Sequence, residues 1–357
     1  MISLEIASKV LVIGPEYNNS KGGVGQAIAN FAFYYEDFRF VSTYKNKNVG
    51  LLTYFGVSLL RFVYILIVNR NIKVLHFHVA SRGSFYRKFI LFLLGKYLWR
   101  KKVIFHLHGG GFANFYNNGN FLQKEMINVF INNSNIFISP SKALYNQVHN
   151  VLRIKINHSF LPNVIVPPKQ VNKIQINKSK KLRCLYLGAI NDNKGIFDLL
   201  KEIGKSDFLQ NNILLTICGG GEVERLKDYI FNEKLSNCTR FLGFVNGKLK
   251  EDLFNSNELL ILPSYIENFP IVILEAFHYN LPVLATKVGG IPEMVENEVT
   301  GYLFDVGDFN QLNTVLCNII NKPSQLSIMR GFIRDRLRKF GSESVIEKLE
   351  LIYKSLL

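Results

Sequence analysis

The sequence predicts an α/β protein made of two doubly wound domains in tandem, each a parallel sheet with helices on both faces. Three observations support this fold class. Short apolar runs alternate with helical patterns through the first half of the chain, the alternation stops at a connection with three prolines, 161–181, and it then starts again. The chain of 357 residues is also long enough for two domains of common size.

The elements of the first half follow one another in a regular order. Each apolar run is expected to be a buried strand and each following segment a helix, because alternation of this kind specifies a parallel sheet. The expected strands are 9–14, 74–80, 102–108 and 135–140, and the expected helices are 25–35, 84–99 and 141–152. We place this domain at residues 1–165.

The second half repeats the pattern, and we place its domain at 166–340. The expected strands are 182–188, 213–218, 239–245, 258–264 and 281–287, and helices are expected from about Gly195, Glu222, Lys248, Pro270 and Pro292. A last amphipathic helix occupies 341–357 and has five apolar positions: Val345, Ile346, Leu349, Leu351 and Ile352. This helix can pack on either domain, and we expect it to pack back on the first domain.

The charge of the chain is concentrated in its first half. The net charge is +16, and residues 1–165 hold 19 Lys and Arg against 5 Asp and Glu, whereas residues 166–357 hold 24 against 22. The most apolar stretch, 49–68, contains Arg61, and we expect no transmembrane helix. The chain opens directly into a strand, without a secretory signal, and its four cysteines have no metal spacing. A cytoplasmic protein is expected.

Glycine-rich turns follow several of the expected strands. In doubly wound sheets, ligands bind outside the carboxyl ends of the strands, so these turns are candidate binding elements. Gly22 and Gly23 precede the first helix, where free N–H groups attract anions, although a purely structural turn is an equal alternative. Gly188 begins a similar turn that ends at Lys194. A lysine before a helix N-terminus is disfavoured by the helix dipole unless an anion shares the site, which favours phosphate binding.

Histidines occupy two of the strands in the first half. His106 and His108 alternate along one strand, so they share a face, and His108 lies at the end of the strand before three glycines. A polar residue satisfied at a strand end is the simpler interpretation. A zinc site of His76, His78, His106 and His108 is disfavoured, because ligands on parallel strands would have to converge and no carboxylate motif accompanies them.

Two glutamates lie in the segment PSYIENFPIVILEAF, residues 263–277. Glu267 precedes Pro270, which suits the first turn of a helix, so its simplest role is to complement the helix dipole. Glu275 lies among apolar residues on what is expected to be a buried helix, and a buried carboxylate needs a hydrogen-bond donor. The vicinal hydroxyls of a sugar can donate two charge-assisted bonds to one carboxylate.

These motifs together resemble those of the family 4 retaining glycosyltransferases, also called glycosyl transferases group 1. The resemblance covers most of the chain and is most specific at 241–306, where the paired glutamates and a downstream Gly-Gly occur at the family's spacing. It implies the GT-B fold, in which two Rossmann-like doubly wound domains face each other across a cleft.

The resemblance also implies roles for residues of the second domain. Glu275 would bind the ribose hydroxyls of a nucleotide. Glu267 would hold the hydroxyls of the transferred sugar, together with the backbone of three following residues: Asn268, Phe269 and Pro270. Phe244 and Val245 would line the base pocket.

The diphosphate site implied by the resemblance involves both domains. Lys194, in the turn that begins at Gly188, would clamp the diphosphate, with the N–H groups near Gly22 and Gly23 completing the site, and His108 would lie beside the sugar. The family usually has an arginine directly after the glycine that corresponds to Gly188, but this chain has Ala189. Lys21, Arg82 or another basic residue is expected to substitute for this cation, and the alternative is a weak or absent activity.

The activity implied is transfer of a sugar, with retention, from a UDP- or GDP-sugar to a glycan or polyprenyl-diphosphate-linked acceptor in surface polysaccharide synthesis. No cofactor and no metal are expected, since Lys194 and backbone dipoles would stabilise the leaving diphosphate. The basic surroundings of the apolar run 89–99 favour peripheral contact with the inner face of an anionic membrane. The alternatives are a nucleotide-sugar epimerase or phosphorylase and a non-catalytic nucleotide-sugar-binding subunit. Nucleic-acid binding is disfavoured, because no basic helix carries a groove-reading motif.

Overall fold

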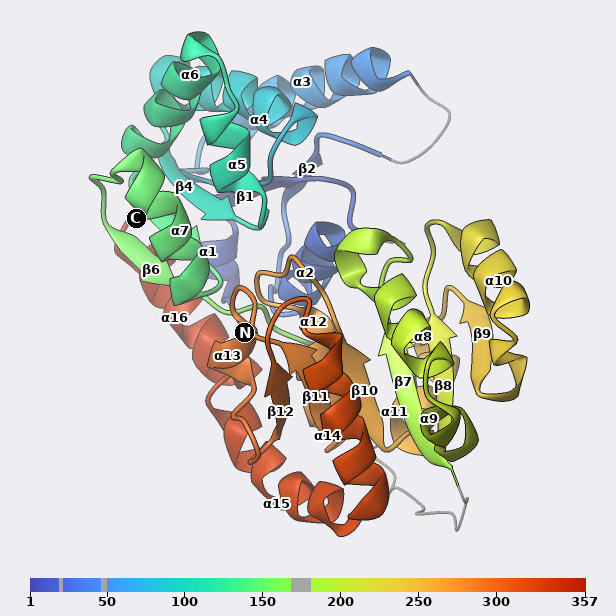
Figure 1. Cartoon of the computed structure of the whole chain (residues 1–357). Coiled ribbons are helices and arrows are strands. Elements are labelled where there is room, and N and C mark those ends of the chain that lie inside the picture. Colours follow the sequence, from blue (N-terminus) through green and yellow to red (C-terminus); the bar gives the residue numbers. More distant parts are fainter. Residues whose placement is uncertain (19–21, 46–49, 168–180) are drawn as a thin grey trace. The chain divides into compact units, whose positions relative to one another are not determined.

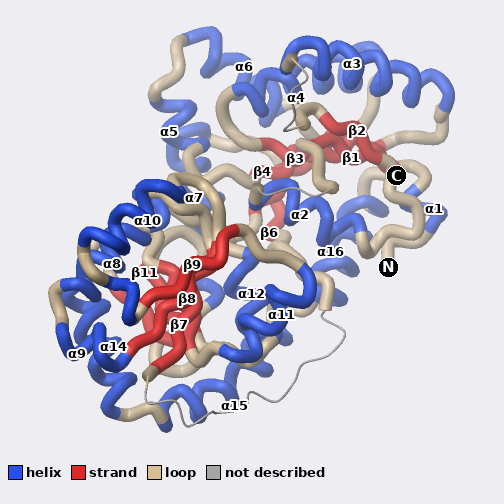
Figure 2. Tube along the Cα trace, turned by 90° about the vertical axis from the view of Figure 1, so that its right-hand side faces the viewer, coloured by secondary structure: helices blue, strands red, loops and turns tan. Residues whose placement is uncertain are grey.

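The computed structural model describes residues 1–18, 22–45, 50–167 and 181–357, which divide into two units. Unit 1 comprises Met1–Val166 and Phe340–Leu357, and unit 2 comprises Pro167–Lys339. Each unit is built on a sheet of six parallel strands, as Figures 1 and 2 show. The prediction of two doubly wound parallel-sheet domains is confirmed.

The sheet of unit 1 has the strand order β2-β1-β3-β4-β5-β6. Its strands are β1 (Val10–Gly14), β2 (Phe40–Ser42), β3 (Val74–Val79), β4 (Lys102–Leu107), β5 (Ile136–Ser139) and β6 (His158–Phe160). Its helices are α1 (Leu4–Ala7), α2 (Gly23–Ala32), α3 (Leu51–Val68), α4 (Gly83–Leu93) with a π-helical continuation η1 (Leu94–Leu98), α5 (Phe112–Asn117), α6 (Phe121–Asn132), α7 (Lys142–Leu152) and α16 (Ser342–Lys354). The strand order reverses between β1 and β3, which makes this the switch point of the sheet.

Alternating side chains of these strands enter two separate cores. Leu75, Phe77 and Phe105 face a core shared with α3, α4 and α6, whereas Val74 and Ile104 face a second core shared with α1, α2 and α16. This alternation is the expected consequence of strand geometry in a sheet that is covered on both faces.

Helix α16 belongs to unit 1 and packs on the second of these cores. Val345, Ile346, Leu349 and Ile352 are buried there as the amphipathic pattern predicts, but Leu351 is 58% exposed, so its assignment to the apolar face is wrong. The buried position is taken instead by Tyr353, which the pattern did not include. A tyrosine can occupy such a site because its hydroxyl has buried hydrogen-bond partners, described below.

The sheet of unit 2 has the strand order β12-β11-β10-β7-β8-β9. Its strands are β7 (Leu182–Leu187), β8 (Ile213–Cys218), β9 (Thr239–Gly243), β10 (Leu259–Leu262), β11 (Val283–Thr286) and β12 (Gly301–Phe304). Its helices are η2 (Asp192–Lys194), α8 (Ile196–Gly204), α9 (Asp207–Asn212), α10 (Val223–Asn232), η3 (Leu235–Asn237), α11 (Gly247–Ser256), α12 (Ile271–His278), α13 (Ile291–Met294), α14 (Phe309–Asn321) and α15 (Ser324–Arg338). The strand order reverses between β7 and β10, so the loops after these two strands are the place to look for a ligand site.

Candidate functional site

The loops that follow β7 and β10 lie against each other at the switch point of unit 2. The backbone N–H of Tyr265 donates to the carbonyl of Asn193 over 2.9 Å, which joins the two loops. Gly195 makes this approach feasible: its φ is +66°, and a Cβ there would lie 2.0 Å from the carbonyl oxygen of Pro263. Only glycine adopts this conformation and leaves this space without strain.

Lys194 and Glu267, two residues that the sequence singled out separately, form an ion pair in this place. The ammonium of Lys194 lies 2.5 Å from Oε1 of Glu267, and both side chains are mostly buried. Ser264 donates its hydroxyl to the same carboxylate oxygen over 3.0 Å, and Lys194 also donates to the carbonyl of Ile266. The site therefore presents one cation and one carboxylate whose positions are set by the loops that carry them.

The downstream Gly-Gly of the sequence motif supports the backbone of Glu267. Gly289 has a φ of +55°, and a Cβ there would lie 1.9 Å from the carbonyl oxygen of Glu267. The N–H of Gly290 donates to the carbonyl of Asn268 over 2.6 Å. The loop after β11 thus fixes the loop after β10, which explains why a glycine stands at position 289.

The glycine turn after β8 supports the turn that begins at Gly188 in the same way. Cβ atoms at Gly219 and Gly221 would lie 1.8 Å and 2.4 Å from the carbonyl oxygens of Gly188 and Ile190, so both positions need glycine. Ala189, between these two carbonyls, is exposed. The space beside it can therefore accept a ligand group or a longer side chain.

A basic residue that the sequence reasoning did not consider holds the same turn. Arg225, on α10, donates through both terminal nitrogens to the carboxylate of Asp192 and through Nη1 to Glu222. These hydrogen bonds lower the pKa of Asp192. The run of charged residues around Arg225 was the available signal in the sequence for such a role. The partner of Arg225, Asp192, lies 33 residues earlier in the chain, so the sequence did not indicate this pair. The guanidinium is engaged by two carboxylates, and it orders the turn.

Glu275, on α12, is largely buried, with a side-chain exposure of 19%, and its neighbours Leu274 and Ala276 are buried, as the sequence suggested. Its carboxylate lies 2.6 Å from the ammonium of Lys250 on α11. The buried acid therefore has the donor that burial requires, and that donor is a lysine 25 positions earlier in the chain. The sequence reasoning missed Lys250, because nothing local in the sequence connects it with α12.

The remaining predicted residues of unit 2 lie in the loops around these pairs. Phe244 is 48% exposed just after β9, whereas Val245 is buried. Phe269 is buried, and Pro270 directly precedes the first residue of α12, as predicted. Asn268 lies between Glu267 and this helix start.

The predicted residues of unit 1 follow β1 and β4. Gly22 is the residue before α2 and Gly23 is its first residue, and a Cβ at Gly23 would contact nothing. His108 directly follows β4, and its backbone N–H donates to the carbonyl of Val79 at the end of β3. Lys21 lies outside the described residues, and Arg82 directly precedes α4 with an exposed side chain. Unit 1 also has a hollow of about 200 Å³, lined in part by Glu16, Tyr54 and Arg61.

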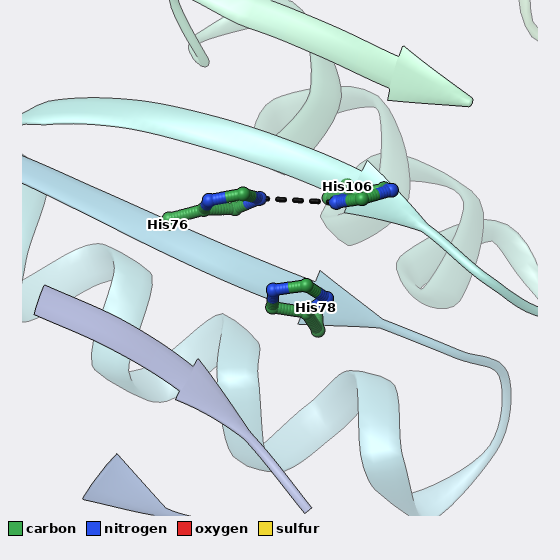
Figure 3. Close-up of side chains that lie close together, drawn as sticks. All are labelled: His76, His78 and His106. Atoms are coloured by element: carbon green, nitrogen blue, oxygen red, sulfur yellow. Dashed lines mark hydrogen bonds between the residues drawn. The ribbon is translucent and has the colours of Figure 1, made fainter. Parts of the chain in front are cut away.

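Four histidines form a cluster in unit 1: His76, His78 and His106 are buried on β3 and β4, and the partly buried His108 directly follows β4. His76 Nε2 lies 3.1 Å from His106 Nδ1, as Figure 3 shows, and His78 Nδ1 lies 2.7 Å from His108 Nε2. His76 Nδ1 in turn contacts the hydroxyl of Tyr353, 2.6 Å away on α16. His108 is thus held at the rim of the sheet by a hydrogen bond from within the core.

The ligand atoms of His76, His78 and His106 do converge, to within 4.8 Å of one another. The argument that histidines on adjacent parallel strands would not converge is therefore wrong. The two strands pair in register, with His78 opposite His106 and His76 opposite Ile104, so the histidine side chains lie together on one face of the sheet. The neutral rings are satisfied mainly by one another and by Tyr353, while His106 Nε2 is buried without a partner in the described part of the chain. The absence of a metal stays a prediction.

Burial sets the protonation of this region. Desolvation lowers the pKa of His76 and of His108 to about 3, and it holds the pKa of His78 and His106 well below the usual range, so all four rings are neutral. Lys88 on α4 is also fully buried, against the expectation that it lies on a solvated basic surface, and burial lowers its pKa to about 7. Its ammonium donates to the hydroxyl of Ser84 over 2.6 Å.

Comparisons with known proteins agree with this fold. Residues 168–335 match the family model Glycosyl transferases group 1. N-acetyl-alpha-D-glucosaminyl L-malate synthase of Bacillus anthracis is 23% identical over 81% of this chain and 76% of its own. Capsular polysaccharide biosynthesis glycosyltransferase CapM of Staphylococcus aureus is 28% identical over 48% of this chain and 46% of its own, so this chain matches about half of CapM. The crystal structure of HepE of Anabaena in complex with UDP superposes with a TM-score of 0.75, at 15% identity, over 98% of this chain and 100% of its own.

The two six-stranded units thus define a protein of the GT-B fold, in which the second unit carries an acid and a lysine at its switch point. The family match lies in this second unit, and the relatives are named as glycosyltransferases. Residues 168–335 are thus similar to the glycosyl transferases group 1, and the chain as a whole has the fold of such enzymes.

Proposed function

We propose that this protein transfers a glycosyl group from a nucleotide diphosphosugar to a glycan or a polyprenyl-diphosphate-linked acceptor, in the synthesis of a bacterial-type surface polysaccharide. The observation that carries the proposal is the pairing of Lys194 with Glu267 at the switch point of unit 2. A cation for the diphosphate and a carboxylate for the sugar hydroxyls are the two groups that such a donor requires side by side. A structural neighbour binds UDP, so a UDP-sugar is preferred over a GDP-sugar.

The proposed roles in unit 2 follow from the positions of the side chains. Lys194 releases Glu267 to sugar hydroxyls when it turns to the diphosphate, and the exposed edge at Ala189 admits the phosphates. Glu275 binds the ribose diol while Lys250 orients its carboxylate. Phe244, Val245, Asn268, Phe269 and Pro270 complete the donor site. The roles of Gly22, Gly23 and His108 in unit 1 stay predictions.

The proposed reaction is a front-face displacement with retention. The bond between the anomeric carbon and the leaving phosphate oxygen breaks as the acceptor oxygen bonds to the same face, and the leaving phosphate oxygen takes the acceptor's proton. Lys194 stabilises the charge that develops on the diphosphate, an effect that can contribute several kcal/mol when the donors are preorganised. The reaction needs no metal in this scheme. We place it in the cytoplasm, with the acceptor at the inner face of the membrane.

The test compares Lys194→Ala, Glu267→Gln and Glu275→Ala with a control, Lys227→Ala, in an exposed ion pair on α10. Thermal shift with UDP and GDP measures donor binding, and product formation from a panel of UDP- and GDP-sugars, with and without EDTA, measures transfer. We expect each of the three variants to lose transfer by at least about a hundredfold, as for the loss of a preorganised charged group. Full activity in all three would overturn the assignment.

The same assays separate the alternative functions. A non-catalytic subunit, which the absence of an arginine at Ala189 allows, would bind UDP but transfer nothing with any donor. An epimerase would convert the donor sugar without an acceptor.

A further inference from the structure

Helix α3 of unit 1 has an apolar outer surface. It runs over 18 residues from Leu51 to Val68 with a mean hydropathy of 2.1, yet only 17% of it is buried. By length and composition it could cross a membrane, so the expectation that no segment does so stays a prediction. Figures 1 and 2 both show α3 along an outer edge of its unit.

The exposed side chains of α3 form one continuous stripe. Val57, Leu60, Tyr64 and Ile67 follow one another at intervals of three and four, and all are more than half exposed, with Leu60 at 71%. We call these four residues the outer stripe of α3. A helix on the surface of a protein in water normally has polar residues on its outer face, so a stripe of this kind marks an interaction surface.

The opposite face of α3 is held in the core of unit 1. Phe62 and Leu66 are buried in the core shared with α4 and the sheet, and Phe62 approaches Gly95 of η1. A helix surrounded by lipid on all sides could not keep these contacts. The outer stripe is therefore available to a membrane only if α3 lies flat in its surface.

The charge of this region indicates the chemistry of the partner. Between Asp37 and Glu125 the chain has 14 Lys and Arg residues and no Asp or Glu. Arg61 is exposed on α3 itself, and Arg70, Arg82 and Arg100 are exposed on the segments that follow it. Juxtaposed apolar and cationic side chains complement a bilayer that contains anionic lipid, where each basic residue near the surface adds to the binding.

We propose that the outer stripe of α3 docks flat on an anionic phospholipid bilayer, with the exposed Arg61 of the same helix against the lipid phosphates. This inference deepens the acceptor part of the proposed function by naming the surface through which unit 1 reaches a lipid-linked acceptor. It moves the membrane contact from the run 89–99, of which Phe89, Leu91 and Phe92 are buried, to α3.

The test is flotation of the full chain with vesicles of phosphatidylcholine, alone or mixed with phosphatidylglycerol, at low and high salt. We expect binding only to the mixed vesicles, and weaker binding at high salt. The triple variant Leu60→Gln, Tyr64→Gln, Ile67→Gln should lose at least about tenfold in vesicle affinity, because it removes most of the apolar area. The matched control is Phe231→Gln, Ile328→Gln, Phe332→Gln, three similarly exposed apolar residues of unit 2, and should bind as the unchanged chain does.

Donor binding is measured on the same samples, as the thermal shift with UDP. An unchanged shift shows that unit 2 of the triple variant is folded, and unchanged protection of the unit 1 backbone amides from hydrogen exchange shows the same for unit 1. A failure of UDP to bind any form would count against the proposed function and not against the docking surface. The docking proposal is overturned if the unchanged chain does not float with mixed vesicles, if the triple variant floats equally well, or if bound protein resists alkaline carbonate extraction, as a spanning helix would. Association of the chain with itself through α3 in solution, without vesicle binding, would also overturn it.

Discussion

At the scale of single residues, the pairing of Lys250 with Glu275 is the feature whose loss is easiest to interpret. The two side chains are 22% and 19% exposed, and their charged atoms lie 2.6 Å apart. Lys250→Met leaves a largely buried carboxylate without a partner, so it should destabilise unit 2 by about 1–3 kcal/mol. If Glu275 binds the donor, KM for the donor should also rise, by roughly tenfold. Urea unfolding and initial-rate kinetics measure the two effects.

A matched control for this change lies on the same helix. Lys248 pairs with Asp252 over 3.1 Å, but both side chains are more than half exposed. Lys248→Met should therefore change the free energy of unfolding by less than about 1 kcal/mol. Equal effects of the two substitutions would contradict a special role for Lys250.

We expect the free energy of unfolding to depend on pH through His76 and His108. In the folded protein the pKa values of His76 and His108 are about 3, whereas the unfolded chain protonates both rings near the ordinary value of 6.5. The unfolded state therefore binds more protons between these values, and stability should fall as the pH is lowered from about 6.5 toward 3. Each ring contributes up to about 1.4 kcal/mol per unit of pKa shift.

Urea unfolding at a series of pH values measures this dependence. His76→Gln keeps a polar group beside Tyr353 and removes one titrating ring, so its stability should fall less steeply with acid. The burial of neutral rings would be contradicted if the urea midpoint of the unchanged chain stayed constant from pH 6.5 to about pH 3.

At the scale of elements, glycine turns bring the strand ends of unit 2 together. Gly195→Ala places a Cβ 2.0 Å from the carbonyl oxygen of Pro263 at a φ of +66°, so the loops that carry Lys194 and Glu267 must separate. We expect the variant to lose UDP-dependent thermal stabilisation and to be destabilised by about 1–3 kcal/mol. Gly204→Ala is the control: it lies at the end of α8, its nearest neighbour would be 3.7 Å away, and it should be neutral or stabilising. Unchanged UDP binding in Gly195→Ala would show that the loops are not coupled.

The strands of both sheets could largely be predicted, because buried parallel strands appear in sequence as continuous apolar runs. Strands β2, β6 and β12 could not. Two of these strands, β2 (Phe40–Ser42) and β6 (His158–Phe160), have three residues each and lie at the edges of their sheet. Strand β12 (Gly301–Phe304) contains a glycine that must approach the carbonyl oxygen of Val283. Their pairing is decided by the tertiary structure and not by a local pattern.

The site shows the same division. Local patterns identified Lys194 and Glu275 as unusual, because each violates an expectation about helix dipoles or burial, whereas Glu267 was singled out by the resemblance. Their partners could not be predicted, because Lys194 and Glu267 are 73 residues apart and meet only through the strand order β10-β7. Lys250 meets Glu275 between two helices, where no strand register gives a guide.

At the scale of the whole molecule, the two ends of the sequence close a single unit. Helix α16 is the last element of the chain, yet it packs on the core of unit 1 with α1 and α2. The hydroxyl of Tyr353 connects it to Tyr35, 2.5 Å away, and to His76 in the sheet. Unit 1 therefore lacks one of its core helices until unit 2 and α16 have been made.

This closure predicts how unit 1 responds to changes in its last helix. Tyr353→Phe leaves the Tyr35 hydroxyl and His76 Nδ1 without their shared partner in a buried place, and should cost about 1–3 kcal/mol. Tyr353→Ala also removes a fully buried ring and should cost about 3–5 kcal/mol, whereas Leu351→Ala, at an exposed position of the same helix, should cost less than about 0.5 kcal/mol. Urea unfolding followed separately in each unit, by tyrosine hydrogen exchange or by limited proteolysis, should show the loss in unit 1 alone, because unit 2 makes no use of this contact. A loss shared equally by both units, or no difference between Tyr353→Ala and Leu351→Ala, would mean that α16 does not complete unit 1.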